Sequence, residues 1–219
     1  MNTAEKLIPL KNATVLANIP FTIDETRVLR EMKVPHAKTV AEIEEKPLAA
    51  AIKRSIEKAY TLIEGKGVFR TYALSGVGKD MVAGPETGDL FQGLHMVKLL
   101  AGCDYATLMA ATIGPRLEAE VERLQKAGEL TGAFILEMIG GWMGDYMAER
   151  VDDRIAREIE RAGYGRTMRF SPGYGDWSLN HQPDVLRLSE AARIGIMVTE
   201  YNIMIPRKSV SAVIGWKRG

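Results

Sequence analysis

The residues best suited to bind a small ligand lie in the short segment 169–174, Arg-Phe-Ser-Pro-Gly-Tyr. Arg169 offers a planar guanidinium group that can hold a carboxylate through two hydrogen bonds. The pair Pro172-Gly173 predicts a type II turn, in which glycine supplies a positive φ and the backbone can approach a ligand. Tyr174 adds an aromatic ring with a polar tip. Composition alone predicts only a turn here, but the combination makes this segment the most specific candidate site in the chain.

A second set of candidate residues lies within one long predicted helix that glycines interrupt. Gly140, Gly141 and Gly144 each cost about 1 kcal/mol relative to alanine inside a helix, so they require a reason. Two explanations stay open: close packing of a neighbouring helix or strand, or a ligand that lies against exposed backbone. Glu137 and Asp145 place carboxylates about one turn on either side of Gly141, which makes both candidate ligand contacts.

A nucleotide-phosphate loop is not supported by the residue spacing. Gly78-Lys79 resembles the end of such a loop, but the motif needs a glycine five positions earlier and Ser or Thr after the lysine. Ala73 and Asp80 occupy those two positions. We therefore expect a mobile loop rather than a phosphate site.

Metal and nucleophile chemistry are not supported either. The three histidines, His36, His95 and His181, are scattered, and none pairs with acids or cysteines at the spacing of metal ligands. Cys103 is the only cysteine, which excludes an intramolecular disulfide and a self-sufficient zinc-thiolate site. We expect it to be a small core thiol, and we predict no metal site and no catalytic acid, base or nucleophile.

Length and composition indicate a globular protein. Of the 219 residues, 46% are hydrophobic and 26% are charged, which excludes disordered, collagen-like and coiled-coil classes. Lys and Arg total 29 against 28 Asp and Glu, a balance that does not favour nucleic-acid or membrane-surface partners. No apolar run approaches the roughly 20 residues of a membrane-spanning helix, and residues 1–10 lack a signal-peptide core. We expect a soluble, unprocessed protein of the reducing cytoplasm.

Hydrophobic periodicity and helix breakers predict the elements that position these residues. An extended arm or edge strand covers the chain to about Pro20, and Thr22 or Asp24 caps a short helix after it. A long helix is predicted over 39–64, with Pro47 kinking it or dividing it in two.

Further along the chain, strands and helices lack the regular alternation of a doubly wound sheet. We predict strands at 68–74, 105–113, 198–205 and 209–216, helices at 90–100, 115–128, 130–162 and 183–193, and a glycine-rich loop or hairpin at 75–88. An α+β fold with a mostly antiparallel sheet fits this order best. We treat 1–219 as a single domain, with an arm and short helix over 1–35 and a core over 36–219.

The motif R-x-x-P-G-Y of segment 169–174 is followed by a leucine-rich helix and by a strand with a proline-centred Ser-x-Ser pattern. Together these features resemble the activation domain of cobalamin-dependent methionine synthase, and above all stand-alone versions of that domain. Further segments that resemble the family are 25–34, 111–114, 145–151 and 199–211. The resemblance implies a curved α+β fold with long helices that flank the sheet.

The resemblance also implies a binding site for S-adenosylmethionine. By similarity, Arg169 holds the amino-acid end of the ligand, backbone groups at Ser171 and Gly173 contact it, and Tyr174 completes the site. In the family, the domain presents the sulfonium methyl group to a cobalamin that has been oxidised to the Co(II) state. A flavodoxin-type donor supplies the electron.

The chain departs from the family pattern in more than one place. An aspartate of the family's N-terminal arm has no convincing counterpart here, and a position on the long helix also differs. The family has a ligand-contacting glutamate on the long helix, and an ungapped alignment places Gly141 there. Glu137 or Asp145 takes that role only after a local shift of the alignment. Met138, Trp142, Met143 and Met147 on the same helix have two interpretations, a surface that faces the corrin or ordinary core packing, and we favour core packing.

The leading hypothesis is a stand-alone reactivation factor that acts on a corrinoid-binding protein or on a methionine synthase without its own activation domain. A flavodoxin- or ferredoxin-type protein would donate the electron. The cobalt-ligand motif Asp-x-His-x-x-Gly is absent, because Val34, Gly93 and Leu179 stand two residues before the histidines. The corrinoid is therefore expected on a different polypeptide. Two alternatives stay open: a small-ligand-binding module of the same fold without methyl transfer, and a non-catalytic subunit of a corrinoid methyltransferase.

Overall fold

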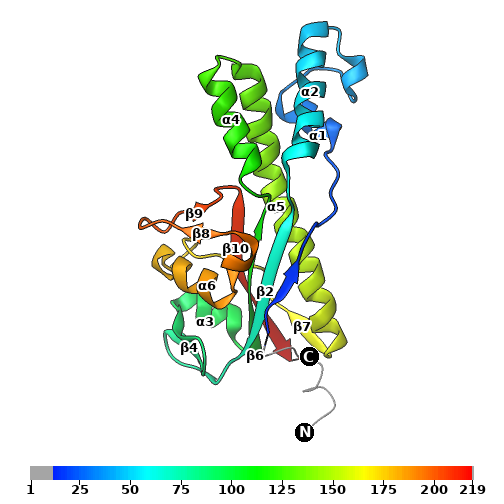
Figure 1. The fold of residues 1–219 in the computed structure, drawn as a ribbon. Helices are drawn as coiled ribbons and strands as arrows, with labels where there is room; N and C mark the ends of the chain where they lie inside the picture. The colour runs from blue at the N-terminus through cyan, green and yellow to red at the C-terminus, as the bar shows by residue number, and fades with distance from the viewer. Residues whose placement is uncertain (1–11, 219) are drawn as a thin grey trace.

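The computed structural model describes residues 12–218, and its centre is a five-stranded sheet with the strand order β1-β2-β6-β10-β7 (Figure 1). The bounds are β1 Thr14–Leu16, β2 Lys66–Ala73, β6 Cys103–Thr112, β7 Tyr164–Arg166 and β10 Ser209–Arg218. All four neighbouring pairs are antiparallel, and Thr112 of β6 lies opposite both Lys66 and Ser209. The structure confirms the predicted α+β class with an antiparallel sheet.

One long helix, α5 (Leu130–Arg161), runs along one face of this sheet and extends past its end (Figure 1). Beyond the sheet it packs with α2 (Lys46–Leu62) and α4 (Arg116–Lys126), and α1 (Glu25–Glu31) lies at the same end of the molecule. Its buried apolar residues recur at helical spacing and form one core with the sheet and these helices.

The other face of the sheet carries α3 (Leu94–Leu100) and α6 (Gln182–Leu188) (Figure 1). A small antiparallel sheet of β3 (Gly76–Val77), β4 (Met81–Gly84) and β5 (Gly88–Gln92) lies beside α3, and a hairpin of β8 (Met197–Val198) and β9 (Met204–Ile205) lies beside α6. Trp177 and Tyr72 are buried on this side. Within residues 12–218, no helix has both the length and the apolar character needed to cross a bilayer.

Most of the predicted elements are confirmed. The strands predicted at 68–74, 105–113 and 209–216 are β2, β6 and β10, and the helices predicted at 115–128 and 130–162 are α4 and α5. Asp24 caps α1, because its side chain accepts a hydrogen bond from the backbone N–H of Arg27 at 3.2 Å. β1 is an edge strand as predicted, whereas the part of the predicted arm over 1–11 lies outside the described residues.

The predicted helix over 39–64 is divided in two. A 3₁₀ turn, Val40–Glu42, precedes α2, and Pro47 lies in the first turn of α2, where its missing N–H breaks no helical hydrogen bond. The helix predicted over 90–100 is wrong at its start. Leu90 and Phe91 belong to β5, and α3 begins only after Gly93, whose φ of +105° is not helical.

The C-terminal third contains three further differences. Segment 198–205 is not one strand, because Asn202 has a φ of +61° and turns the chain between β8 and β9. α6 ends at Leu188, and Glu190 with a φ of +61° leads into a 3₁₀ turn, Ala191–Ile194. β7 was not predicted, since its three residues, Tyr-Gly-Arg, carry no strand pattern of their own.

Candidate functional site

The segment that carries the sequence motif forms the predicted type II turn. The backbone N–H of Tyr174 donates to the carbonyl of Ser171 at 3.3 Å, which closes a four-residue turn with Pro172 at its second position. Gly173 occupies the third position with a φ of +90°. A Cβ atom there would meet the side chain of Leu179 at ordinary contact distance, 3.5 Å. The requirement for glycine therefore comes from the backbone conformation rather than from lack of space.

Pairing with a strand and a buried tryptophan hold this turn. Phe170 exchanges two backbone hydrogen bonds with Val213 of β10, at 3.1 and 2.8 Å. The N–H of Gly173 donates to the carbonyl of Trp177 at 2.8 Å, and the indole N–H of Trp177 donates to the carbonyl of Leu90 at 2.9 Å. The aromatic ring of Phe170 stacks on that of Trp177, with 6.3 Å between ring centroids.

A cavity of about 350 Å³ opens beside the turn. Its wall comes from the turn, the middle of α5, Leu179, the start of α6, the β8–β9 hairpin, Arg207 and the first residues of β10. Buried Gln182 donates to the hydroxyl of Ser211 at 2.7 Å, so the hydrogen bonds of these two lining side chains serve the wall itself. Such a concave site with a few polar groups among apolar ones is typical of small-ligand pockets.

The cavity wall also carries one charge of each sign. Asp145 of α5 is exposed, and Arg207 lies in the segment between β9 and β10. The Nε of Arg207 is 3.8 Å from Oε2 of Glu118, a long ion pair that leaves most of the guanidinium free to bind. A carboxylate and a guanidinium in one wall can bind the ammonium and the carboxylate of an amino acid.

The structure brings together three of the six residues that the sequence pointed to, since Ser171, Tyr174 and Asp145 line the same cavity. Gly173 lies in the turn itself. Arg169 precedes the turn and does not line the cavity, but its Nη1 is buried and has no hydrogen-bond partner among the described residues.

Glu137 lies elsewhere, because its Oε1 accepts a hydrogen bond from the ammonium group of Lys208 at 2.5 Å. Neither Glu137 nor Lys208 lines the cavity. Of the two acidic candidates on α5, the structure therefore places Asp145 alone at this cavity.

The glycines of α5 divide between the two explanations that the sequence left open. A Cβ atom on Gly140 would lie 2.7 Å from Cδ2 of Leu117, and one on Gly144 would lie 3.6 Å from the backbone of Lys208. Gly140 therefore permits close packing, whereas 3.6 Å at Gly144 is an ordinary contact distance that leaves room for a Cβ atom. Gly141 is exposed, and a Cβ atom on it would meet nothing within 4 Å. Its backbone is open to a ligand.

The methionines of α5 support the interpretation as core packing. Met143 and Met147 are buried in the core between α5 and the sheet. Met138 and Trp142 are partly buried against the same core, and the guanidinium of Arg27 covers the ring of Trp142 at 4.7 Å from its centroid. The alternative, a methionine surface that faces a corrin, is wrong for Met143 and Met147.

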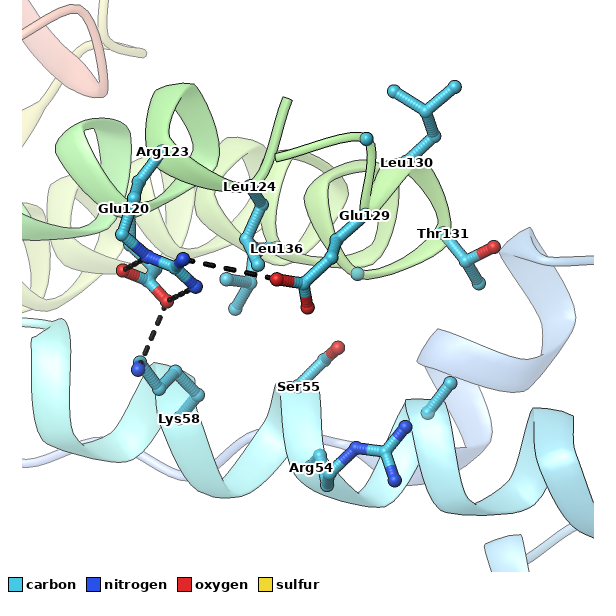
Figure 2. Close-up of a pocket in the computed structure, with 13 residues that line it drawn as sticks. Arg54, Ser55, Lys58, Glu120, Arg123, Leu124, Glu129, Leu130, Thr131 and Leu136 are labelled. Atoms are coloured by element: carbon cyan, nitrogen blue, oxygen red, sulfur yellow. Dashed lines mark hydrogen bonds and ion pairs between the residues drawn. The ribbon is translucent and has the colours of Figure 1, made fainter. Parts of the chain in front are cut away.

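A second cavity, of about 410 Å³, lies between α2 and the turn that joins α4 to α5 (Figure 2). The carboxylate of Glu120 bridges Arg123, at 2.9 Å, and Lys58, at 3.0 Å. The hydrogen bonds from Arg123 and the pairing with Lys58 lower the pKa of Glu120 to about 2, although burial acts in the opposite direction. These ion pairs join α2 to α4, and no residue that the sequence singled out lies there.

The remaining sequence candidates, Gly78-Lys79 and Cys103, serve the fold: the first lies in a turn and the second is buried. Gly78 and Lys79 lie in the turn between β3 and β4, where the N–H of Gly78 donates to the carbonyl of Met81, and not at the start of a helix. Cys103 is buried at the start of β6, and burial raises the pKa of its thiol. Across the described chain, no three His, Cys, Asp or Glu side chains are grouped so that they could hold a metal ion.

Sequence reasoning missed several lining residues, notably Gln182, Asn202 and Arg207. They come from α6 and from the segment around the β8–β9 hairpin, which reach the cavity only through the tertiary fold. The one signal for this region was the similarity of segment 199–211 to the activation-domain family.

Comparison with known proteins gives a match in structure but not in sequence. No family model matches the chain, and no curated protein matches it. The crystal structure of the MetH reactivation domain bound to AdoHcy is similar, with a TM-score of 0.60 and 16% sequence identity. The match covers 98% of this chain and 82% of that one. The chain therefore has the fold of the MetH reactivation domain.

Proposed function

We propose that this chain binds S-adenosylmethionine and its product S-adenosylhomocysteine at the cavity beside the 171–174 turn. In this proposal it is a cytoplasmic reactivation factor that supports reductive methylation of a corrinoid, a cobalamin, carried by a separate protein. The corrinoid protein, or a methionine synthase without its own activation domain, is one partner. A flavodoxin- or ferredoxin-type electron donor is the other.

The observation that carries the proposal is the buried and unpaired Nη1 of Arg169. Its Nη1 is buried and has no partner among the described residues, although an unpaired buried donor is costly. Arg169 precedes the type II turn, whose residues Ser171 and Tyr174 line the cavity. A structure with the same fold was solved with AdoHcy, a molecule with an amino-acid carboxylate. In this proposal, the ligand carboxylate is the missing partner of Arg169.

The other residues have distinct roles in this proposal. Asp145 accepts a hydrogen bond from the ammonium group of the ligand, because it is the acidic residue of α5 that lines the cavity. Backbone groups at Ser171 and Gly173 hold the amino-acid end, and Tyr174 covers the ligand with its exposed ring. Gly141, one helical turn before Asp145 on α5, has an open backbone but does not line the cavity.

The chemistry suits a protein without acid-base machinery. S-adenosylmethionine carries a sulfonium methyl group, which is an electrophile. A Co(II) corrinoid that has gained one electron is nucleophilic enough to take this methyl group without further activation, and S-adenosylhomocysteine is released. The chain then needs only to bind the methyl donor, to orient it towards the partner and to exclude water. These are tasks for binding residues rather than for catalytic ones.

The direct test is transfer of a labelled methyl group. The purified chain is mixed with methyl-labelled S-adenosylmethionine, a corrinoid protein and a low-potential reductant, and label on the corrinoid is measured. We expect label only when the chain and the reductant are both present, and at least about tenfold less with Arg169→Ala. Homocysteine methylation by the isolated chain, with no corrinoid, would overturn the assignment.

Two other outcomes identify the alternatives. Binding of the ligand without transfer to any corrinoid protein indicates a small-ligand module of the same fold. Transfer that is unchanged by Arg169→Ala indicates a non-catalytic subunit, because the ligand site of this chain would then not be needed.

A further inference from the structure

Asp176, which follows the 171–174 turn, contacts a helix that is remote in the sequence. Its Oδ2 accepts a hydrogen bond from the backbone N–H of Leu94 at 2.7 Å, and its Oδ1 accepts one from the N–H of His95 at 3.2 Å. The ring Nδ1 of His95 lies 3.0 Å from the same Oδ1. Asp176 thus caps the N-terminus of α3 from 81 and 82 residues away.

α3 cannot supply this cap from its own sequence. Its N-cap position is Gly93, which has no side chain. A Cβ atom on Gly93 would lie 2.7 Å from Oδ1 of Asp176, and one on Gly175 would lie 3.0 Å from Nδ1 of His95. Both glycines also have a positive φ, +105° and +57°. The two segments therefore meet at a contact that admits no side chain on either glycine.

Backbone hydrogen bonds connect Trp177, the neighbour of Asp176, to the 171–174 turn. Trp177, the next residue, donates its N–H to the carbonyl of Tyr174 at 3.1 Å and accepts from the N–H of Gly173 at 2.8 Å. Tyr174 is 67% exposed, so few contacts of its own side chain hold it in place. The position of the turn then depends on the pairing of Phe170 with Val213 before it and on its attachment to the Asp176–Trp177 pair after it.

The charge of Asp176 strengthens this attachment. Although burial favours the protonated form, hydrogen bonds from His95 and Leu94 hold the pKa of Asp176 below its ordinary value. An ionised carboxylate at a helix N-terminus is also stabilised by the helix dipole. A turn that is already ordered loses less conformational entropy when a ligand binds.

We propose that Asp176 is a positioning residue: by capping α3 it holds residues 171–174 in the conformation that binds the ligand, without touching the ligand itself. Asp176 does not line the cavity. The inference rests on the proposed function for its ligand, but the ordering of the turn by Asp176 can be measured with no ligand present.

The test compares two cap deletions. Asp176→Ala and the control Asp24→Ala each remove an N-capping carboxylate from a seven-residue helix, and α1 lies at the opposite end of the sheet from α3. Dissociation constants for S-adenosylhomocysteine are measured well below the melting temperature of both variants. We expect about tenfold weaker binding for Asp176→Ala, less than twofold change for Asp24→Ala, and an intermediate value for Asp176→Asn, which keeps an acceptor oxygen.

Hydrogen exchange of the ligand-free proteins supplies the second readout. The amides of Gly173 and Trp177 should exchange about tenfold faster in Asp176→Ala than in Asp24→Ala, because their hydrogen bonds open more often. Unchanged exchange at these amides, in Asp176→Ala or in Asp176→Asn if the alanine variant does not fold, would overturn the inference. If the wild-type protein binds no S-adenosyl ligand, the proposed function fails, and the exchange rates alone decide the role of Asp176.

Discussion

Two single residues support the proposed ligand site: an arginine with an unpaired guanidinium nitrogen and a glycine with a positive φ. Arg169 keeps a buried Nη1 unpaired among the described residues, and Gly173 holds a φ of +90°. The first feature is costly unless a ligand completes it, and the second is strained for any other residue. Each leads to a substitution with a measurable effect on binding.

Arg169→Ala should weaken binding of S-adenosylhomocysteine about tenfold to a hundredfold. The reason is the loss of charge-assisted hydrogen bonds to the ligand carboxylate, worth roughly 1.5–3 kcal/mol. Arg166→Ala is the matched control, since the guanidinium of Arg166 already pairs with Asp152. Titration calorimetry of both variants checks the prediction, and equal affinities for the two would refute the role of Arg169.

Gly173→Val should reduce ligand affinity more than Ser171→Ala does. Valine is strained at positive φ, so the turn must change its conformation, whereas the role of Ser171 in the proposal comes from its backbone. Affinity and melting temperature are measured for both variants. If Gly173→Val matches the wild-type protein in both, the type II turn is not needed for binding.

Among the helices, α5 has two adjacent glycines in different surroundings: Gly140 packs against Leu117, and Gly141 faces open space. Gly140→Ala should destabilise the protein by about 1–3 kcal/mol, because its Cβ would lie 2.7 Å from a side-chain carbon of buried Leu117. Gly141→Ala should stabilise it by about 0.5–1 kcal/mol, because its Cβ meets nothing and alanine favours the helix. Urea unfolding of the two variants checks both signs. The same sign for both would contradict the packing of α5 on α4.

The bridge between α2 and α4 gives a prediction for acid pH. The pKa of Glu120 is lowered from 4.5 to about 2, so its contribution is complete above pH 4.5 and is lost as the pH falls towards 2. Glu120→Gln should cost about 1–2 kcal/mol at pH 6, allowing for the exposed ends of Lys58 and Arg123, and almost nothing at pH 2. Urea unfolding at both pH values compares the variant with the wild-type protein. A difference that does not depend on pH would show that Glu120 acts through packing and not through charge.

The elements differ in how well the sequence alone could predict them. α5 was predictable because apolar residues recur at helical spacing over its whole length. β7 was not, because its strand structure comes only from pairing with Trp216 to Arg218 of β10. The start of α3 was misplaced because Leu90 and Phe91 are apolar in either structure, and their assignment to β5 depends on packing in the core that contains Trp177.

At the scale of the whole molecule, the site joins parts of the chain that no local pattern connects. The turn at 171–174 was predictable because its motif is contiguous, and Asp145 was a candidate because of its place on α5. Arg207 and Gln182 reach the same cavity only because the β8–β9 hairpin and α6 fold beside the start of β10. Of the two acidic candidates, the sequence could not choose, because the pairing of Glu137 with Lys208 is a tertiary contact.

A calorimetric titration of the wild-type protein with S-adenosylhomocysteine tests directly whether the chain binds this ligand. 5′-Methylthioadenosine, which lacks the amino-acid carboxylate and ammonium groups, serves as the comparison ligand. We predict saturable binding of one S-adenosylhomocysteine per chain. The comparison ligand should bind at least about tenfold more weakly, because it offers no carboxylate to Arg169 and no ammonium group to Asp145. No binding of S-adenosylhomocysteine at millimolar concentration under several buffer conditions, or equal affinity for both ligands, would contradict this prediction.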